Sequence, residues 1–244
     1  MEQFEIKTLI PLELNGVDLS FTNASLFMVL AVALTCTFLT VAMGSRSLVP
    51  TRMQSIAELS YEFIANMVRD NIGQNGMRYL PFVFSLFIFV LMLNLLGMIA
   101  IPGVWKPFTV TSHIIVTFAL AALVFFVVLG IGFANHGLGF FKLFVPDGVP
   151  LYVLPLIVVI EFISFLIRPI SLSVRLFANM LAGHTMMKVF AGFVVSLGVF
   201  GFVPFIVMLA LTAFELLVAV LQAFIFSILT CIYLNDAINL HEGH

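Results

Sequence analysis

Charged residues are scarce in this sequence. Only 9% of the 244 residues are Asp, Glu, Lys or Arg, whereas 62% are hydrophobic and the mean hydropathy is +1.21. Soluble domains carry about 25% charged residues and about 45–50% apolar ones. So few charges cannot cover so large an apolar fraction, which excludes a soluble enzyme, a secreted domain and a disordered chain. The composition therefore predicts an integral membrane protein.

Other features are also rare or absent, and each absence excludes a class of function. The net charge of −2 provides no basic surface for nucleic acid. Cys36 and Cys231 have no Cys or His at metal-ligand spacing, so we expect two free thiols. The His241 and His244 pair in the polar tail indicates a metal site only weakly. Because the sequence has no Gly-x4-Gly-Lys-Ser/Thr phosphate loop and no catalytic triad, we expect no cofactor, no metal and no enzymatic activity of its own.

Three apolar runs match the roughly 20 residues that cross a bilayer as a helix. They are residues 24–43, 80–101 and 112–134. The segment before the first run, residues 1–23, carries an excess of acidic residues and one lysine, Lys7, so it lacks the positive start of a cleavable signal peptide. We therefore expect the first run to remain in the membrane as a span.

Residues 51–73 have a different pattern, because charged residues alternate with an apolar stripe at helical spacing. Thr51 and Gln54 follow Pro50 and fit a capping box at the start of a helix. The pattern predicts an amphipathic helix in the membrane interface. Packing on the surface of a partner protein is an equally acceptable interpretation.

The C-terminal apolar segments, residues 151–192 and 205–239, are too long for upright helices at a rise of about 1.5 Å per residue. Long, strongly tilted helices that form a hairpin suit these lengths, with the glycine- and proline-containing residues 192–205 as the turn. We predict an all-α integral membrane protein. It consists of one upright span, a surface helix, an upright helix pair and this tilted hairpin, in a single membrane domain.

The distribution of basic residues predicts the orientation of the chain. Arg46, Arg52, Arg69 and Arg78 all follow the first span. Because loops rich in Lys and Arg lie in the cytoplasm, we expect this segment to be cytoplasmic and the N-terminus to lie outside.

Six ionisable residues interrupt the apolar hairpin: Glu161, Arg168, Arg175, His184, Lys188 and Glu215. A charged group at the centre of a membrane helix costs about 2.5–3.5 kcal/mol on insertion scales, so such residues usually face a bundle interior or mark an ion pathway. Arg168 and Lys188 are equally compatible with side chains that reach the interface or with a structural salt bridge. His113 and His136, near the ends of the third span, are expected to form hydrogen bonds at the interface.

Helical phase groups these residues. Glu161, Arg168 and Arg175 recur every seven residues and share one face of a helix, and Asn179 joins that face, whereas His184 lies on the opposite side. Glu215 and Gln222 share a face of the last helix. In an antiparallel hairpin we expect Glu215 to meet His184 and Gln222 to approach Arg175.

The chemistry of these groups favours ion transport over catalysis. A carboxylate and an imidazole can pass protons along, whereas an arginine keeps its proton and can only block their passage or attract a carboxylate. Acidic groups on either side of a permanent positive charge are what two offset half-channels require.

Two segments carry a specific resemblance. The sequence SLSVRLFANMLAGH at residues 171–184, with QAFIFSILTCIY at residues 222–233, resembles subunit a of F-type ATP synthases. Asn94-Leu-Leu-Gly97 and the position of Glu161 support the resemblance, which covers most of the chain.

The resemblance implies a role for each of these residues. Arg175 would be the essential arginine that faces the ring of c subunits and separates two proton half-channels. Glu215 and His184 would take up protons, Glu161 would release them, and Asn179 and Gln222 would line the path. Asp236 would be an acid near the channel mouth, on the uptake path with Glu215 and His184. The implied partners are the c ring, b-type peripheral-stalk subunits and the rest of the complex, in a bacterial or mitochondrial inner membrane.

Two rival functions remain open. A self-contained proton-coupled secondary transporter would need an inverted repeat and a broken-helix substrate site, and neither pattern is visible in the sequence. An intramembrane enzyme would need a nucleophile–base pair or a metal pair, for which His184 and Glu215 are the only candidates.

Overall fold

The computed structural model describes residues 8–11, 13–14, 17–18, 20–44, 50–98, 109–145, 150 and 152–239. Within these residues, five helices are long and apolar enough to cross a membrane. They are α1 (Asn23–Met43), α3 (Leu80–Met98), α4 (Ile114–His136), α5 (Leu154–Ser196) and α6 (Phe202–Ile238). The predicted class, an all-α integral membrane protein, is confirmed.

Short elements connect these helices. The helix α2 (Arg52–Ile72) follows α1, and 3-10 turns form η2 (Gln74–Tyr79), η3 (Val110–Ser112), η4 (Gly137–Phe144) and η5 (Gly198–Gly201). Before α1, the strands β1 (Thr8–Ile10) and β4 (Phe21–Thr22) pair antiparallel, as do β2 (Glu13–Leu14) and β3 (Val17–Asp18). The sequence analysis predicted no strands, because their two or three residues are too few to produce a pattern.

The helix α2 begins as its capping residues predict. The Thr51 side chain accepts a hydrogen bond from the Gln54 backbone N–H at 3.3 Å, but the Gln54 side chain bonds Glu58 instead of completing the capping box. The C-terminal half of its apolar stripe, including Ile64 and Val68, is buried against α3 and α6. Met53 and Ile56, in the N-terminal half, are exposed. The chain itself therefore covers only part of the amphipathic face.

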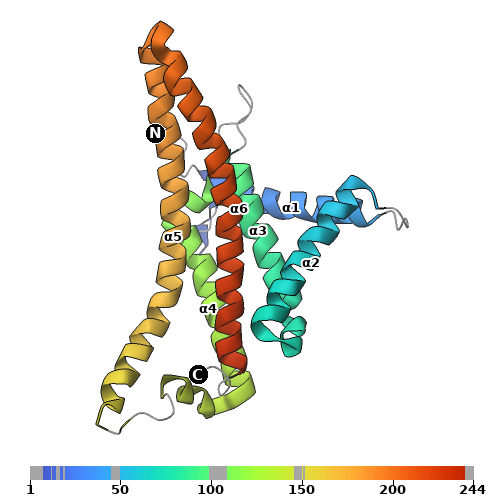
Figure 1. Cartoon of the computed structure of the whole chain (residues 1–244), viewed down its shortest axis with the longest axis vertical. Coiled ribbons are helices and arrows are strands. Elements are labelled where there is room, and N and C mark those ends of the chain that lie inside the picture. Colours follow the sequence, from blue (N-terminus) through green and yellow to red (C-terminus); the bar gives the residue numbers. More distant parts are fainter. Residues whose placement is uncertain are drawn as a thin grey trace.

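The helix α3 forms the centre of the bundle, where it packs against α1, α2 and α6 (Figure 1). Its contact with α1 is a small apolar cluster that includes Phe27, Ala31 and Leu93. Its contact with α6 includes a buried polar group, because Asn94 Nδ2 donates to the Ala219 carbonyl at 3.3 Å.

The helices α5 and α6 form a long antiparallel hairpin that turns at η5 and extends beyond the other helices (Figure 1). With 43 and 37 residues, they are about 64 and 55 Å long at a rise of about 1.5 Å per residue. The hydrocarbon core of a bilayer is about 30 Å thick. Helices of this length fit inside it only if they tilt by roughly 60° from the membrane normal.

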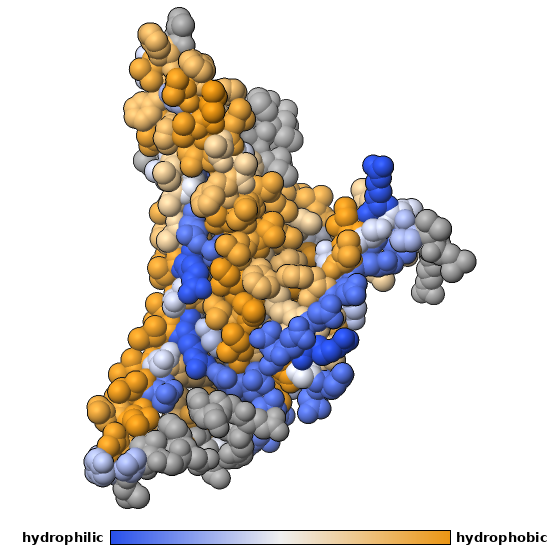
Figure 2. All heavy atoms as spheres, viewed as in Figure 1, coloured by the Kyte–Doolittle hydropathy of each residue, from blue (hydrophilic) through white to orange (hydrophobic). Residues whose placement is uncertain are grey.

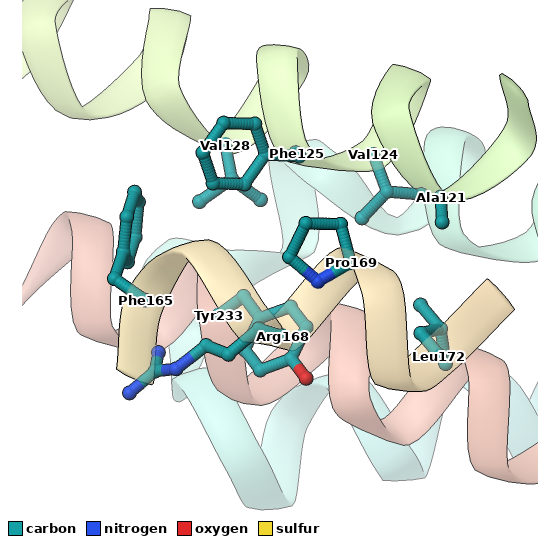
Figure 3. A pocket seen from close by; sticks show the side chains of 9 residues that line it. All are labelled: Ala121, Val124, Phe125, Val128, Phe165, Arg168, Pro169, Leu172 and Tyr233. Carbon is teal, nitrogen blue, oxygen red and sulfur yellow. The ribbon is translucent and has the colours of Figure 1, made fainter. Parts of the chain in front are cut away.

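Pro169 lies inside α5, and the helix continues past it. Its ring faces α4 and packs beside Ala121, Val124 and Phe125 around a cavity of about 10 Å³ (Figure 3). Next to this cavity, the Phe165 ring meets Phe125 with ring centroids 5.0 Å apart, and it also packs against Phe140 and Phe144 of η4. These rings join α4, η4 and α5 into one core.

Two glycines of α4 allow a test of this packing. A Cβ atom on Gly132 would overlap the buried Phe140 ring, whereas one on Gly130 would meet nothing within 4 Å. We expect Gly132→Ala to lower the free energy of unfolding by about 1–3 kcal/mol, because overpacking a filled core forces side chains out of place. Gly130→Ala, the matched control, should leave it unchanged or raise it slightly. Unfolding of the purified chain in SDS, followed by circular dichroism, measures both, and equal stability of the two variants would contradict the packing described here.

Candidate functional site

The central pair of the hairpin is His184 of α5 and Glu215 of α6. His184 Nε2 lies 3.4 Å from Glu215 Oε1, and the two side chains are only 4% and 5% exposed. The predicted meeting of these residues is confirmed. In the part of the chain that the structure describes, His184 Nε2 and both carboxylate oxygens of Glu215 make no hydrogen bond with suitable geometry. The two groups are therefore close enough to form an ion pair, and both keep unused capacity for hydrogen bonds.

Gly183 makes room for this pair. A Cβ atom at this position would lie 2.8 Å from Glu215 Oε1 and 3.0 Å from its carboxyl carbon, so the carboxylate packs directly against the α5 backbone. The glycine next to His184 therefore determines where the Glu215 carboxylate lies.

Arg175 has a different environment, because it is exposed on the outer face of α5. No hydrogen bond or ion pair joins it to another of the described residues. Polar side chains that are exposed or half-buried continue along this face: Glu161, Ser164, Arg168, Ser171, Arg175 and Asn179. Figure 2 shows hydrophilic residues in a narrow line between the hydrophobic surfaces of the hairpin. We call these six residues the polar stripe of α5.

The approach of Gln222 to Arg175 stays a prediction. Gln222 is buried on the inner face of α6, whereas Arg175 points outward, and no hydrogen bond joins them among the described residues. Helical phase gave the correct faces within each helix, but it does not determine how far each helix is rotated toward its neighbour.

Asp236 lies away from the pair formed by Glu215 and His184. We expected it on the uptake path with Glu215 and His184, but it lies 21 residues after Glu215, about 31 Å along α6 at a rise of about 1.5 Å per residue. Asp236 Oδ2 instead accepts a hydrogen bond from Arg168 Nη1 at 2.7 Å. The Arg168 guanidinium also lies over the Tyr233 ring, 5.1 Å from its centroid (Figure 3). Arg168 therefore belongs to a structural salt bridge, one of the two interpretations left open for it.

Both histidines near the ends of α4 form the expected hydrogen bonds. The His113 ring nitrogen Nδ1 lies 3.3 Å from the Thr109 carbonyl, and His136 Nε2 lies 3.0 Å from the Ile238 carbonyl. The second contact joins the C-terminal ends of α4 and α6. These ends therefore lie at the same side of the bundle.

Three buried polar residues were missed as site residues. Asn94, Thr109 and Thr111 are at most 1% exposed, and Asn94 Oδ1 and the two hydroxyl oxygens have no hydrogen-bond partner among the described residues. Asn94 bonds the carbonyl of Ala219, which follows Glu215 by four residues, or about one turn of α6. The signal in the sequence was a polar amide in an otherwise apolar run. Most buried polar side chains have hydrogen-bond partners, so an unsatisfied oxygen calls for an explanation such as bound water or an ion.

Some predicted features lie outside the described residues, among them the His241 and His244 pair. Within the described residues, no group of three or more His, Cys, Asp or Glu side chains could hold a metal ion.

Comparisons with known proteins identify the family. The model of the family described as ATP synthase A chain matches residues 25–235. The ATP synthase subunit a of Chelativorans sp. (strain BNC1) is 61% identical over 251 residues, which cover 100% of this chain and 98% of that protein. The subunits a of Agrobacterium fabrum and Maricaulis maris are 59% and 56% identical and cover 99% and 100% of this chain, and 97% and 98% of their own lengths.

This chain belongs to the ATP synthase A chain family. The resemblance carried by residues 171–184 and 222–233 is confirmed. As a family member with five helices able to span a membrane, it is a multi-pass membrane protein that functions in ATP synthesis and ion transport.

Gly183 provides a test of the His184–Glu215 geometry. Gly183→Ala would place a methyl group on the Glu215 carboxylate and move it away from His184. We expect ATP-driven proton pumping in membrane vesicles to fall by about tenfold or more, because a displacement of about 1 Å in a reacting group is sufficient for losses of this size. Gly192→Ala, on the same helix with nothing within 4 Å of the added methyl, is the control. Equal pumping by both variants would show that the carboxylate position is unimportant.

Proposed function

We propose that this chain is the proton-channel stator subunit of the membrane sector of a rotary ATP synthase. In this proposal it provides two offset half-channels for protons, which reach a ring of c subunits from one side of the membrane and leave it toward the other. The chain itself carries no nucleotide chemistry. It acts with the c ring, b-type peripheral-stalk subunits and the remaining complex in an energy-coupling membrane, and its bacterial relatives favour a bacterial inner membrane.

The observation that carries the proposal is the exposed position of Arg175 in the polar stripe of α5. A guanidinium in the middle of a membrane helix cannot face lipid without a large cost in free energy. In the part of the chain that the structure describes, no residue pairs with it, so another protein must cover this face. A self-contained transporter would instead enclose its charged groups within its own bundle. A ring whose carboxylates pass Arg175 one at a time provides the missing partner.

Proton uptake is assigned to Glu215 and His184. Both groups titrate, both are buried between α5 and α6, and both retain free bonding capacity. The unpartnered polar atoms of Asn94, Thr109 and Thr111 support a hydrated approach to Glu215 past α3 and η3. If the N-terminus lies outside, the C-terminal end of α3 and the turn η3 both lie on the outer side of the membrane. This is the side required for uptake.

Proton release is assigned to Glu161, while Asn179 and Gln222 are assigned as polar lining of the region near Arg175. Glu161 lies fourteen residues before Arg175 on the same polar stripe, so it is about 21 Å away along α5 at a rise of about 1.5 Å per residue. The contact between His136 and the Ile238 carbonyl supports placing the end of α6, with Asp236, on the cytoplasmic side. Asp236 therefore belongs to the release side in this proposal.

Arg175 separates the two paths. An arginine stays protonated in proteins, so it cannot pass a proton from Glu215 to Glu161, and its charge repels protons that would cross directly. It also attracts a c-ring carboxylate that has lost its proton. A proton must then travel around with the ring before it leaves.

Replacement of the arginine tests the proposed function. We expect Arg175→Ala to abolish coupled ATP synthesis and ATP-driven proton pumping, because the two half-channels then lose their barrier. The measurement uses membrane vesicles with equal amounts of assembled complex. Arg52→Ala removes a positive charge from the exposed start of α2 and should leave both activities intact. Unimpaired coupling in Arg175→Ala would overturn the proposal.

Removal of the buried carboxylate tests the uptake path. Glu215→Gln keeps the size of the side chain but cannot carry a proton. We expect proton uptake to slow by at least about tenfold, since a positioned group that transfers protons contributes about 10²–10⁴-fold. Assembly should be unaffected, and Glu62→Gln, at an exposed position on α2, is the matched control. A wild-type rate in Glu215→Gln would remove this residue from the path.

A further inference from the structure

A buried hydrogen bond joins α4 to α5 close to Arg175. Thr117 Oγ1 and Ser173 Oγ lie 3.1 Å apart, and the two residues are 0% and 1% exposed. Ser173 precedes Arg175 by two residues on α5. Neither hydroxyl was singled out by the sequence, and the proposed proton path uses neither.

The direction of this bond follows from the other contact of Thr117. Thr117 Oγ1 donates its only proton to the Ile114 carbonyl at 3.1 Å. A hydroxyl has one donor and two acceptor positions, so Thr117 accepts from Ser173. Ser173 therefore directs its proton across the helix interface and not toward its own helix.

A hydroxyl group that donates to a neighbouring helix is unusual among the described spanning helices. Most hydroxyl groups of the spanning helices donate to the carbonyl four residues earlier in the same helix, as do Thr35, Thr37, Thr40, Ser85, Thr185, Thr212, Ser227 and Thr230. Such bonds satisfy the hydroxyl but carry no information about neighbouring helices. The bond from Ser173 depends on where α4 lies.

Among the described residues, no other hydrogen bond joins α5 to α4 near this point. Leu172, Leu176 and Met180 are buried there, and Figure 3 shows Leu172 and Pro169 facing the apolar side chains of α4. Apolar contact is non-directional and tolerates rotation of a helix about its axis. Lipid also provides little driving force to hold two apolar helix faces together. A hydrogen bond weakens steeply when its angle changes, so it restricts that rotation.

We propose that Ser173 and Thr117 are positioning residues that fix the rotation of α5 about its axis and so determine the direction in which Arg175 points. Two residues along an α-helix correspond to about 200°, so a contact that holds Ser173 against α4 directs Arg175 to the opposite, outer face. The effect on proton transport rests on the proposed role of Arg175, whereas the effect on the rotation of α5 does not.

Four variants separate the hydroxyl from the volume of the side chain. Thr117→Val keeps the shape and removes the hydroxyl, whereas Thr117→Ser keeps the hydroxyl and removes a methyl group. Ser173→Ala removes the other partner. Ser227→Ala is the matched control, because Ser227 is equally buried and bonds the Ala223 carbonyl of its own helix.

The first measurement is geometric and uses the assembled complex. Nitroxide labels are attached to cysteines at Ala178 on the outer face of α5 and at Ile115 on the exposed face of α4, after Cys36 and Cys231 are replaced by alanine. We expect Thr117→Val and Ser173→Ala to shift or broaden the distance between the labels by about 2–4 Å, as rotation of a helix with a radius of about 5–6 Å would do. Thr117→Ser and Ser227→Ala should keep the distance of the unmodified pair.

The second measurement is ATP-driven proton pumping by the same variants without labels, at equal amounts of assembled complex. We expect Thr117→Val and Ser173→Ala to lose about tenfold, Thr117→Ser and Ser227→Ala to remain active, and the double variant to be no worse than either single one. A changed distance with normal pumping would support the positioning role but contradict the role of Arg175 in the proposed function. An unchanged distance in both Thr117→Val and Ser173→Ala would overturn this inference, whatever the pumping rate.

Discussion

Hydrocarbon offers no hydrogen-bond partners, and this constraint determines how every polar group of the hairpin is placed. A polar side chain on α5 or α6 must find a partner within the chain, bind water or be covered by another protein. The inner face of α5 follows the first two routes, with Ser173 bonded to α4 and His184 beside Glu215. On the outer face, Arg175 and Asn179 are exposed. The same helix thus presents one face that the chain completes and one face that it leaves for a partner.

The close packing of α3 against α6 depends on small residues. Ala219 and Ala223 are fully buried on the inner face of α6, and the lack of bulk there lets Asn94 reach the Ala219 carbonyl. Small residues at helix contacts are common in membranes, because close backbone approach replaces the missing hydrophobic driving force. At Gly97, a Cβ atom would lie 2.8 Å from the Thr109 side chain, so this glycine has the same effect at the C-terminal end of α3. Close approach therefore joins α3 to α6 at Asn94 and to the Thr109 side chain at Gly97.

The sequence predicted those features that depend on short-range periodicity and on length. Hydropathy located the spans, and helical phase placed His184 opposite Arg175 and next to Glu215. The pairing of Asp236 could not be obtained in this way, because it depends on which turn of α6 lies beside Arg168 in the folded hairpin. The same is true of Ser173 and Thr117, since a serine in an apolar helix gives no sign of whether it bonds its own backbone or a neighbouring helix. Asn94 was visible in its motif, but only its burial without full hydrogen bonding distinguishes it from a packed amide.

Three charged residues on the polar stripe of α5 recur every seven residues, about 10.5 Å apart, yet the fold gives each a different electrostatic environment. Asp236 neutralises Arg168 through a 2.7 Å contact, while Glu161 and Arg175 have no ion-pair partner among the described residues. Arg175 is therefore the uncompensated positive charge of this face. In the proposed function, a c-ring carboxylate that moves along α5 would meet one strong attraction instead of two. If Asp236 did not neutralise Arg168, a second positive charge one heptad away would compete for the carboxylate, so the ion pair helps to make Arg175 the unique stopping point.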